Sequence, residues 1–536
     1  MRSSPLKRFA FNPTNVVLLG LALAALLSHC VANGLCSYGY FRDELYYLAC
    51  TGHLDIGYVD QPPFSIYVLA VNRLLFGDSL IALRIVPSLT HAITVLLVGL
   101  MTRQLGGKRF AQSLAATAAL LSPIYLGMNG VFTMNCIDIL VWTSAMYVLV
   151  CILRPSPNPN GLEFPPTKGV EGRTPQTRLW LLLGLILGIG LLNKISVLWL
   201  GAGIAVGLLA THHRVWFKTR WPWVAGALAF LIFLPYIIWN IQHDFAHLEF
   251  IRNASGEKYA SLSPIDFIIG QVILQNPLSL PLWVAGLFFL LFDKEGKPYR
   301  PLGIVYLVAF LILIINGHSK PEYLSPAYGM LFAAGGVMFE RFVIRRSWQW
   351  LRVTYPFLFV LTGGILAPLV VPLLPVEMYI KYQDALGVAP STAEAKRLDR
   401  LPQFYADMFG WKEKAEAVAR VFNNLTAEEQ SRCAIFADNY GRCAAIDFFG
   451  AKYGLPKSIG NHNSYWIWGP RQYTGEIVLV LGSNPDDCRR NFEEVTVIDT
   501  ASCTYCMPYE NHLTISVCRK LKKPMHKVWA EIKHYE

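Results

Sequence analysis

Long apolar segments, separated by short polar loops, run through the first 375 residues of this chain. A helix needs about 17 to 25 apolar residues to cross a bilayer, or slightly fewer where it is tilted or broken. The segments that meet this length fall at 14–33, 80–104, 110–127, 136–153, 178–192, 195–211, 221–240, 276–292, 301–316, 323–343 and 353–375. The pattern predicts an α-helical integral membrane protein with about eleven transmembrane helices.

The first apolar segment has two interpretations, because a basic head followed by an apolar run is typical of both a signal peptide and a first span. The stretch reads MRSSPLKRFAFNPTNVVLLGLALAALLSHC. Further spans follow it, and no clear small-x-small cleavage site does. We therefore interpret it as an uncleaved transmembrane helix.

Lys and Arg residues alternate sharply between the two sides of this layout. The loops on the side of the N-terminus hold twenty of them, whereas the opposite loops, counted up to residue 322, hold six. Basic residues are enriched in cytoplasmic loops. The bias predicts a cytoplasmic N-terminus, an outward-facing first loop at 34–79 and, with an odd number of spans, an extracytoplasmic tail. The organisation fits a multi-pass membrane protein.

One cytoplasmic loop differs from the others in composition. Residues 154–178 read RPSPNPNGLEFPPTKGVEGRTPQTR, which is rich in Pro and Gly. Such a composition favours irregular structure. We interpret this loop as a mobile linker.

Composition supports the membrane assignment. Hydrophobic residues make up 54% of the 536 positions and charged residues 15%, against roughly 25% charged in soluble domains. The net charge of +11 would suggest nucleic acid if the basic residues gathered with aromatic ones on a soluble domain. They are instead spread along the loops, so topology explains the charge and we expect no nucleic-acid partner.

The tail, 376–536, changes character and predicts a soluble extracytoplasmic α/β domain after a transmembrane domain at 1–375. Short β-type runs such as CAIFA and GEIVLVLG alternate with helical stretches such as YGRCAAIDFFGAKYG. Six of the eleven cysteines lie here, and an oxidising compartment permits disulfides among them, with no pairing readable from the spacing. Cys503 and Cys506 form CTYC, for which a structural role is favoured over a redox or zinc motif. The aromatic stretch at 461–473 fits either a carbohydrate-binding surface or core packing.

Acidic residues gather in the first outer loop, which is costly near hydrocarbon unless they are hydrated, paired or used. Asp43 and Glu44 directly follow the first span and begin LYYLACTGHL, whose spacing predicts a helix lying in the interface. Asp60 precedes two prolines that rigidify the next helix start. Asp55 and Asp78 we interpret as simply solvated.

Two charged residues interrupt apolar segments. Asp138 in TMNCIDILVW lies near the outer end of the fourth segment, and Lys194 interrupts GIGLLNKISVLWL. An ionisable residue at membrane depth is a functional candidate by default. The competing explanations are a first-turn helix acid for Asp138 and snorkelling of the Lys194 side chain to the interface.

The order of these motifs resembles a known family. RDELYY, then DQPPF, TMNCID, LLNKIS and HSKPEYLSPAYGMLFAAGG are similar to motifs of the bacterial branch of the dolichyl-phosphate-mannose protein mannosyltransferase superfamily (glycosyltransferase family 39-like), which includes the aminoarabinose transferase of lipid A. The resemblance covers roughly 15–375. It implies a GT-C glycosyltransferase that transfers a sugar from a polyprenyl phosphate to a lipid, glycan or protein acceptor at the outer face of the membrane.

The resemblance also implies roles for individual residues. Asp43 matches the family's catalytic base, Glu44 is its neighbour, and Asp138 matches a second active-site carboxylate. In an inverting transfer, one carboxylate accepts the proton of the acceptor hydroxyl while the lipid phosphate leaves from the opposite face of the sugar. Cations stabilise the charge on the departing phosphate. The candidates for binding the donor and its phosphate are Arg42, Asp60, Gln61, Lys194, Arg252, Lys258, His318, Lys320 and Tyr323.

One residue departs from the family pattern. The aminoarabinose transferase has an acidic residue and then lysine before the paired prolines, whereas this chain has Asp60 and Gln61. One phosphate-binding cation is therefore missing, which puts the aminoarabinose substrate in doubt. The resemblance does not require a metal, although paired acids permit a divalent ion.

Two other classes of protein compete with the enzyme. A transporter or flippase for a lipid-linked saccharide also places charges within a membrane, but the sequence has no clear internal repeat and its polar residues gather at the outer ends of spans. A non-catalytic anchor would not explain the acidic first loop. For the enzyme we expect Asp43, Asp138, Lys194 and Lys320 to converge on one outward cavity.

Overall fold

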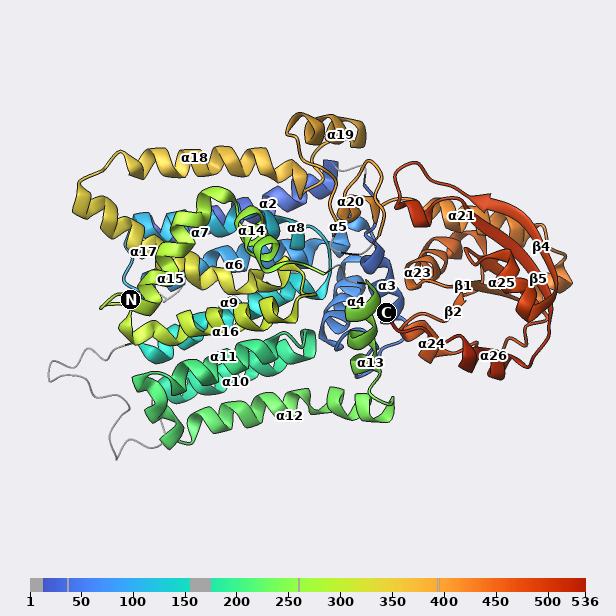
Figure 1. Cartoon of the computed structure of the whole chain (residues 1–536), viewed down its shortest axis with the longest axis horizontal. Coiled ribbons are helices and arrows are strands. Elements are labelled where there is room, and N and C mark those ends of the chain that lie inside the picture. Colours follow the sequence, from blue (N-terminus) through green and yellow to red (C-terminus); the bar gives the residue numbers. More distant parts are fainter. Residues whose placement is uncertain (1–12, 36–37, 155–174, 259–260, 393, 395) are drawn as a thin grey trace, which may run out of the picture. The chain divides into compact units, whose positions relative to one another are not determined.

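The structure is a computed structural model that describes residues 13–35, 38–154, 175–258, 261–392, 394 and 396–536. Its contacts divide the chain into two compact units, each built from several segments (Figure 1). The first unit comprises Met1–Cys36, Leu83–Ile237 and Ser261–Leu374, and the second comprises Ser37–Ala82, Ile238–Ala260 and Pro375–Glu536. The first outer loop and the tail thus belong to the same unit.

The first unit is helical. Its principal helices are α2 (Pro13–Leu35), α6 (Ile85–Gln104), α7 (Arg109–Leu120), α8 (Pro123–Met128), α9 (Met134–Leu153), α10 (Pro175–Asn193), α11 (Val197–Leu209), α12 (Trp221–Gln242), α14 (Pro264–Leu274), α15 (Leu280–Phe292), α16 (Arg300–Asn316), α17 (Tyr328–Arg346) and α18 (Leu351–Leu366). The last turns of α12 belong to the second unit. Each predicted apolar segment coincides with one of these helices or with a pair of them.

Eight helices of the described residues are long and apolar enough to cross a membrane, or nine if α14 and α15, which meet at a bend of 94°, form one broken span. The prediction of an α-helical membrane protein is confirmed. The number eleven stays a prediction, because α7, α11 and α15 have only 12, 13 and 13 residues. The predicted linker at 154–178 lies almost wholly outside the described residues.

Close helix packing in the first unit depends on glycine. A Cβ added to Gly286 of α15 would lie 2.0 Å from the carbonyl oxygen of Leu331, and one added to Gly335 of α17 would lie 2.0 Å from that of Leu282. Both distances are far below van der Waals contact. Small residues allow membrane helices to approach each other in this way. We infer that these two glycines set the separation of α15 and α17.

The second unit contains a five-stranded sheet with the order β2-β1-β3-β5-β4. Strands β1 (Cys433–Ala437), β2 (Ile459–Gly460) and β3 (Ile477–Leu481) are parallel, and β4 (Phe492–Ala501) and β5 (Leu513–Leu521) complete it in antiparallel pairing. Every residue of β3 is buried, as expected for a central strand covered on both faces. The predicted α/β character of the tail is confirmed, and β1 coincides with the CAIFA run.

Helices from three parts of the sequence belong to the same unit as this sheet. The first outer loop supplies α3 (Arg42–Thr51), α4 (Phe64–Phe76) and part of α5 (Leu80–Leu83), and the segment after α12 supplies α13 (Ala246–Asn253). The tail supplies α19 (Val376–Ala385), α20 (Gln403–Ala406), α21 (Trp411–Asn423), α22 (Ala427–Arg432), α23 (Tyr440–Phe449), α24 (Ser464–Trp468), α25 (Pro485–Asn491) and α26 (Met525–Glu531). Helix α3 contacts α23, so the acidic first loop packs directly on the tail.

The aromatic stretch at 461–473 contributes to packing within this unit. Tyr465 is buried and donates to Asp447 at 3.0 Å, and the indoles of Trp466 and Trp529 each donate to the other's backbone carbonyl. Trp468 stacks on His53 with ring centroids 4.2 Å apart. These contacts favour the packing interpretation of the stretch.

Candidate active site

Asp138 and Lys194 meet inside the first unit. Asp138 lies one turn into α9 with only 1% of its side chain exposed, and Lys194 Nζ is 3.7 Å from its Oδ2. The hydroxyl of Ser196 donates to both carboxylate oxygens, at 3.1 and 3.0 Å. Lys194 also donates to Asn135 Oδ1 at 2.7 Å. Pairing and hydrogen bonding explain how both charges are tolerated among apolar helices.

A break in the helix path places these groups. Helix α10 ends at Asn193 and α11 begins at Val197, so Lys194 and Ser196 lie in the short turn between them. The side chain of Asn193 is anchored to the Met134 carbonyl at 2.8 Å. The turn is thereby held against the start of α9, which directs Lys194 and Ser196 toward Asp138.

The polar segment HSKPEYLSP, which precedes α17, contributes to the same cluster. Tyr323 lies in the 3₁₀ helix η5 (Pro321–Ala327), and its ring centroid is 4.8 Å from Lys194 Nζ, a cation–π distance. Lys320 directly precedes η5. His318 is exposed and hydrogen-bonds to Asn316 of its own loop. The first unit thus brings Asp138, Lys194 and Tyr323 together, and the part of His318 in donor binding stays a prediction.

Asp43 lies in the second unit, in the first turn of α3. About a third of its side chain is exposed, and its carboxylate accepts a hydrogen bond of 2.9 Å from Tyr440 Oη. Arg42 Nε is 3.5 Å away. The phenol and the guanidinium hold the carboxylate in place. Asp43 is therefore an accessible carboxylate in a defined orientation, and its part as a catalytic base stays a prediction.

Arg42 is buried, and its side chain contacts residues of the tail. Its guanidinium donates to Tyr509 Oη at 2.9 Å, and it lies 3.4 Å from Glu394 and 3.6 Å from Asp407. The backbone N–H of Arg42 also donates to the Asp407 carbonyl. These contacts fix α3 to the tail and occupy the guanidinium of Arg42. Its part in binding a phosphate stays a prediction.

Glu44 also has a structural explanation. Its side chain is fully buried, and its carboxylate accepts from the backbone N–H of Phe41 at 2.9 Å. A glutamate at this position commonly caps the first turn of its own helix. The contact gives Glu44 a structural role, and its part in catalysis stays a prediction.

The DQPPF motif is buried beside α3. Tyr46 of α3 donates to Asp60 at 2.9 Å, and the Tyr46 hydroxyl accepts from the backbone of Ser464. Gln61 is fully buried, and neither of its amide atoms has a hydrogen-bond partner within the described part of the chain. The motif therefore has a buried neutral amide at the position where, according to the resemblance, the aminoarabinose transferase has a lysine.

The remaining basic candidates lie in the segment after α12. Arg252 is exposed in α13, and Lys258 ends a π-helical turn at Ala254–Lys258, with its side chain outside the described positions. Among the contacts that the structure describes in the second unit, Arg252 makes no hydrogen bond or ion pair with Asp43. Their proposed part in donor binding stays a prediction, as does the convergence of Asp43 with the first-unit cluster.

The partners of α3 in the tail were not among the residues predicted from the sequence. Tyr440, Glu394, Asp407 and Tyr509 lie about 350 or more positions from Arg42 and Asp43 along the chain. No periodicity or motif links such distant positions. A buried basic residue does require acidic partners, but the sequence does not show which ones.

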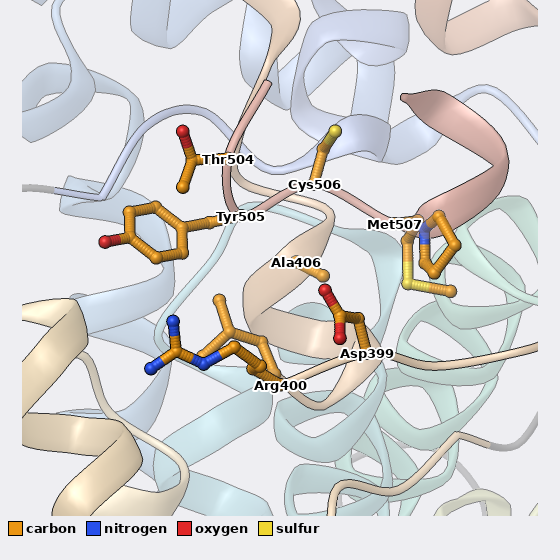
Figure 2. A pocket seen from close by; sticks show the side chains of 9 residues that line it. Asp399, Arg400, Ala406, Thr504, Tyr505, Cys506 and Met507 are labelled. Carbon is orange, nitrogen blue, oxygen red and sulfur yellow. The ribbon is translucent and has the colours of Figure 1, made fainter. Parts of the chain in front are cut away.

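No group of three or more His, Cys, Asp or Glu side chains is arranged to hold a metal ion anywhere in the described ranges. Cys503 and Cys506 form a disulfide. Figure 2 shows the residues that line a small hollow beside this loop, among them Asp399, Arg400, Thr504 and Tyr505. Its volume is about 10 Å³, which holds one water molecule. The disulfide fits the structural role favoured for the CTYC loop, which stays a prediction.

Asp407 provides a pH test of the buried network in the second unit. Burial raises the pKa of Asp407 to about 7, although Arg42 opposes the shift. An acid whose pKa is higher in the folded than in the unfolded state binds more protons when folded, so its contribution to stability falls as pH rises from about 4 to about 7. We expect Asp407→Asn to gain thermal stability relative to wild type between pH 5 and pH 8.

The matched control for this prediction is Asp78, whose pKa is lowered by its hydrogen bond with Arg73. Its protonation is complete only below the usual carboxyl range, so Asp78→Asn should show a constant offset over the same interval. Thermal denaturation of both variants at several pH values measures the difference. A constant offset for Asp407→Asn as well would contradict the assignment.

Comparison with known proteins supports the resemblance read from the motifs. The family described as dolichyl-phosphate-mannose-protein mannosyltransferase matches residues 60–159 and 168–239. An undecaprenyl phosphate-α-4-amino-4-deoxy-L-arabinose arabinosyl transferase of Pseudomonas fluorescens is 22% identical over 59% of this chain. The lipid A galacturonosyltransferase RgtD of Rhizobium johnstonii is 27% identical over 38% of it. The alignments cover 54% and 39% of those two relatives, so the matched region spans about half their length or less.

Solved structures extend the likeness to the fold. ArnT of Cupriavidus metallidurans, bound to undecaprenyl phosphate, superposes with a TM-score of 0.60 at 12% identity over 94% of this chain and 97% of that one. This chain has the GT-C fold. The archaeal oligosaccharyltransferase AglB of Archaeoglobus fulgidus is also similar, with a TM-score of 0.53 at 12% identity over 85% of this chain and 65% of AglB.

The family match and the structural match cover different parts of this GT-C protein. The family match begins at Asp60 and covers Asp138 and Lys194, whereas Asp43 lies before it. The structural match with ArnT extends over nearly the whole chain and thus includes much of the tail. The predicted family resemblance and the predicted multi-pass membrane architecture are both confirmed.

Proposed function

We propose that this GT-C protein transfers a glycosyl group from a polyprenyl phosphate to an acceptor hydroxyl at the outer face of the bacterial inner membrane. The observation that carries the proposal is Asp43, an accessible carboxylate oriented by Tyr440 and Arg42 at the start of α3. The relatives named above are transferases that act on undecaprenyl phosphate-linked sugar or on lipid A, and ArnT binds undecaprenyl phosphate. The N-terminus is cytoplasmic and the tail extracytoplasmic in this proposal, as the charge bias predicts.

Asp43 acts as the general base. Its carboxylate accepts the proton of the acceptor hydroxyl as the acceptor oxygen forms a bond with the anomeric carbon. The bond between that carbon and the phosphate oxygen breaks on the opposite face of the sugar, which gives inversion and releases the lipid phosphate. The phosphate is already a good leaving group, so no second carboxylic acid has to protonate it.

Lys194 binds the phosphate of the donor. Asp138, Asn135 and Ser196 hold the turn and its ammonium group in place, while 12% of the Lys194 side chain stays exposed. A fixed cation stabilises charge that develops on the leaving phosphate at little cost in reorganisation. Asp138 is then a positioning residue for Lys194. Because Gln61 is neutral, Lys194 and Lys320 carry more of this role than their counterparts in the aminoarabinose transferase.

The proposal is tested with purified full-length protein in proteoliposomes and a panel of polyprenyl phosphate sugars. Glycolipid, glycan and peptide acceptors are offered together, and the release of polyprenyl phosphate and the glycosylated product are measured. We expect product from at least one donor. Movement of a lipid-linked sugar across the bilayer with no transfer would instead establish a flippase and overturn the proposal.

Lys194→Met tests the phosphate-binding role. Loss of one charge-assisted contact costs about 1.5–3 kcal/mol, which corresponds to roughly 10- to 150-fold in donor kcat/KM. We expect the loss to depend on the donor and not on the acceptor, because only the donor carries the phosphate. Lys294→Met serves as the comparison, because Lys294 is an exposed lysine of the same unit, between α15 and α16. An equal loss against both substrates would contradict the assignment.

A further inference from the structure

The tail contains a cavity of about 250 Å³ that the proposed transfer reaction does not use. It lies on one face of the sheet, where Phe436 of β1 and Val478 and Val480 of β3 form its floor. Trp529 of α26 and Phe492 of β4 also line it. The cover on this face comes from α25 and α26, which have only seven residues each, so the sheet is incompletely covered.

The cavity lies at the carboxyl ends of three parallel strands. Asp438 directly follows β1, Asn461 directly follows β2, and Ser483 follows β3 by two residues, and all three line the cavity. The chain leaves β1 toward β2 on one side and returns to β3 on the other, so the strand order reverses beside β1. Open α/β sheets bind ligands at such a reversal, outside the carboxyl ends of the strands.

Several polar groups at this edge offer hydrogen-bond acceptors. Asn461 donates its amide to the Ile532 carbonyl at 2.9 Å, which leaves its Oδ1 buried with no hydrogen-bond partner in the described chain. The carboxylates of Asp438 and Asp487 line the cavity as well. Asp438 pairs with Arg442, and Asp487 pairs with Arg490. An occupant that donates hydrogen bonds would satisfy Asn461 and these carboxylates.

The residues that line the cavity exclude several ligand classes. None of them is Lys or Arg, so an anionic phosphate or carboxylate would meet no lining cation. A purely apolar chain would leave Asn461 Oδ1 unsatisfied, which costs free energy in a buried position. A pyranose ring meets both demands, because its C–H faces pack on aromatic side chains and its hydroxyls donate hydrogen bonds. Pockets for small molecules commonly combine an apolar lining with a few polar groups in this way.

We propose that this cavity binds one neutral sugar residue, with its apolar face against Trp529 and Phe436 and its hydroxyls on Asn461, Asp438 and Ser483. The site is a binding site only, and its occupancy does not depend on the proposed transfer reaction. The loop after β1 serves two places at once, because Asp438 lines the cavity and Tyr440, two residues later, donates to Asp43.

The test uses full-length protein in lipid nanodiscs and saturation-transfer NMR with methyl glycosides of several hexoses and pentoses, beside hexose 6-phosphates. We expect saturation transfer to at least one neutral methyl glycoside and none to the phosphates. Val480→Phe fills the cavity and should abolish the signal while leaving the melting temperature unchanged or higher. Val497→Phe is the matched control, because Val497 lies on β4 with 44% of its surface exposed.

Two further variants separate this site from the proposed transferase chemistry. Asn461→Ala should weaken glycoside binding about tenfold, the effect of one lost hydrogen bond. Asp43→Asn should bind the glycoside as wild type does, even though it is expected to lose transfer activity. The proposal is overturned if no methyl glycoside receives saturation, or if Val480→Phe and Asn461→Ala both retain the full signal.

Discussion

Replacing Asp43 with asparagine is expected to lower the rate of glycosyl transfer by about 10²- to 10⁴-fold, the usual contribution of a general base. The amide keeps the size of the carboxylate and can still accept the hydrogen bond from Tyr440, so the local structure should persist. It cannot accept the proton of the acceptor hydroxyl. We expect the loss in kcat with every acceptor, and with little change in the donor KM.

Two neighbouring carboxylates provide controls for this result. Asp55→Asn alters an exposed acid of the same loop and should retain near-wild-type turnover. Glu44→Gln removes the charge of the helix-capping residue, so it should lower the melting temperature more than the rate at permissive temperature. Equal turnover by Asp43→Asn and wild type would remove Asp43 from the role of base.

The candidate site shows which inferences a sequence supports. Asp138 and Lys194 stand out because a charge within an apolar helix is costly, and the structure pairs them. Asp43 stands out because it directly follows an apolar span in a recognisable motif. Tyr440 and Glu394 have no such signal, because a polar residue in a polar tail is ordinary. What they contact depends on how distant segments fold together.

In the fold, too, local features were predicted from the sequence, and features that depend on distant contacts were not. Apolar length predicted the helical segments, and short β-type runs predicted β1 and β3, since both properties are local. The bend of 94° between α14 and α15 was not predicted, because helix direction depends on packing. The grouping of the first outer loop with the tail was also not predicted, since it depends on the contact of α3 with α23.

Arg42→Met is expected to destabilise the second unit by about 3–5 kcal/mol, the usual effect of removing one partner from a buried ionic network. The guanidinium lies 3.4 Å from Glu394 and 3.6 Å from Asp407, both of which are buried. Methionine would fill much of the space but leave both carboxylates without their cation. Thermal denaturation at pH 7 should therefore show a large fall in the melting temperature.

The size of this effect follows from burial and not from the number of ion pairs. Arg73→Met, in the same outer loop, breaks a partly exposed pair with Asp78, and such pairs contribute about 1 kcal/mol or less. Adding Glu394→Gln and Asp407→Asn to Arg42→Met removes the uncompensated charges and should recover part of the lost stability. Equal losses for the Arg42 and Arg73 variants, or no recovery in the triple variant, would show that Arg42 does not neutralise these acids. Recovery would establish that one buried cation fastens the helix of the proposed base to the tail.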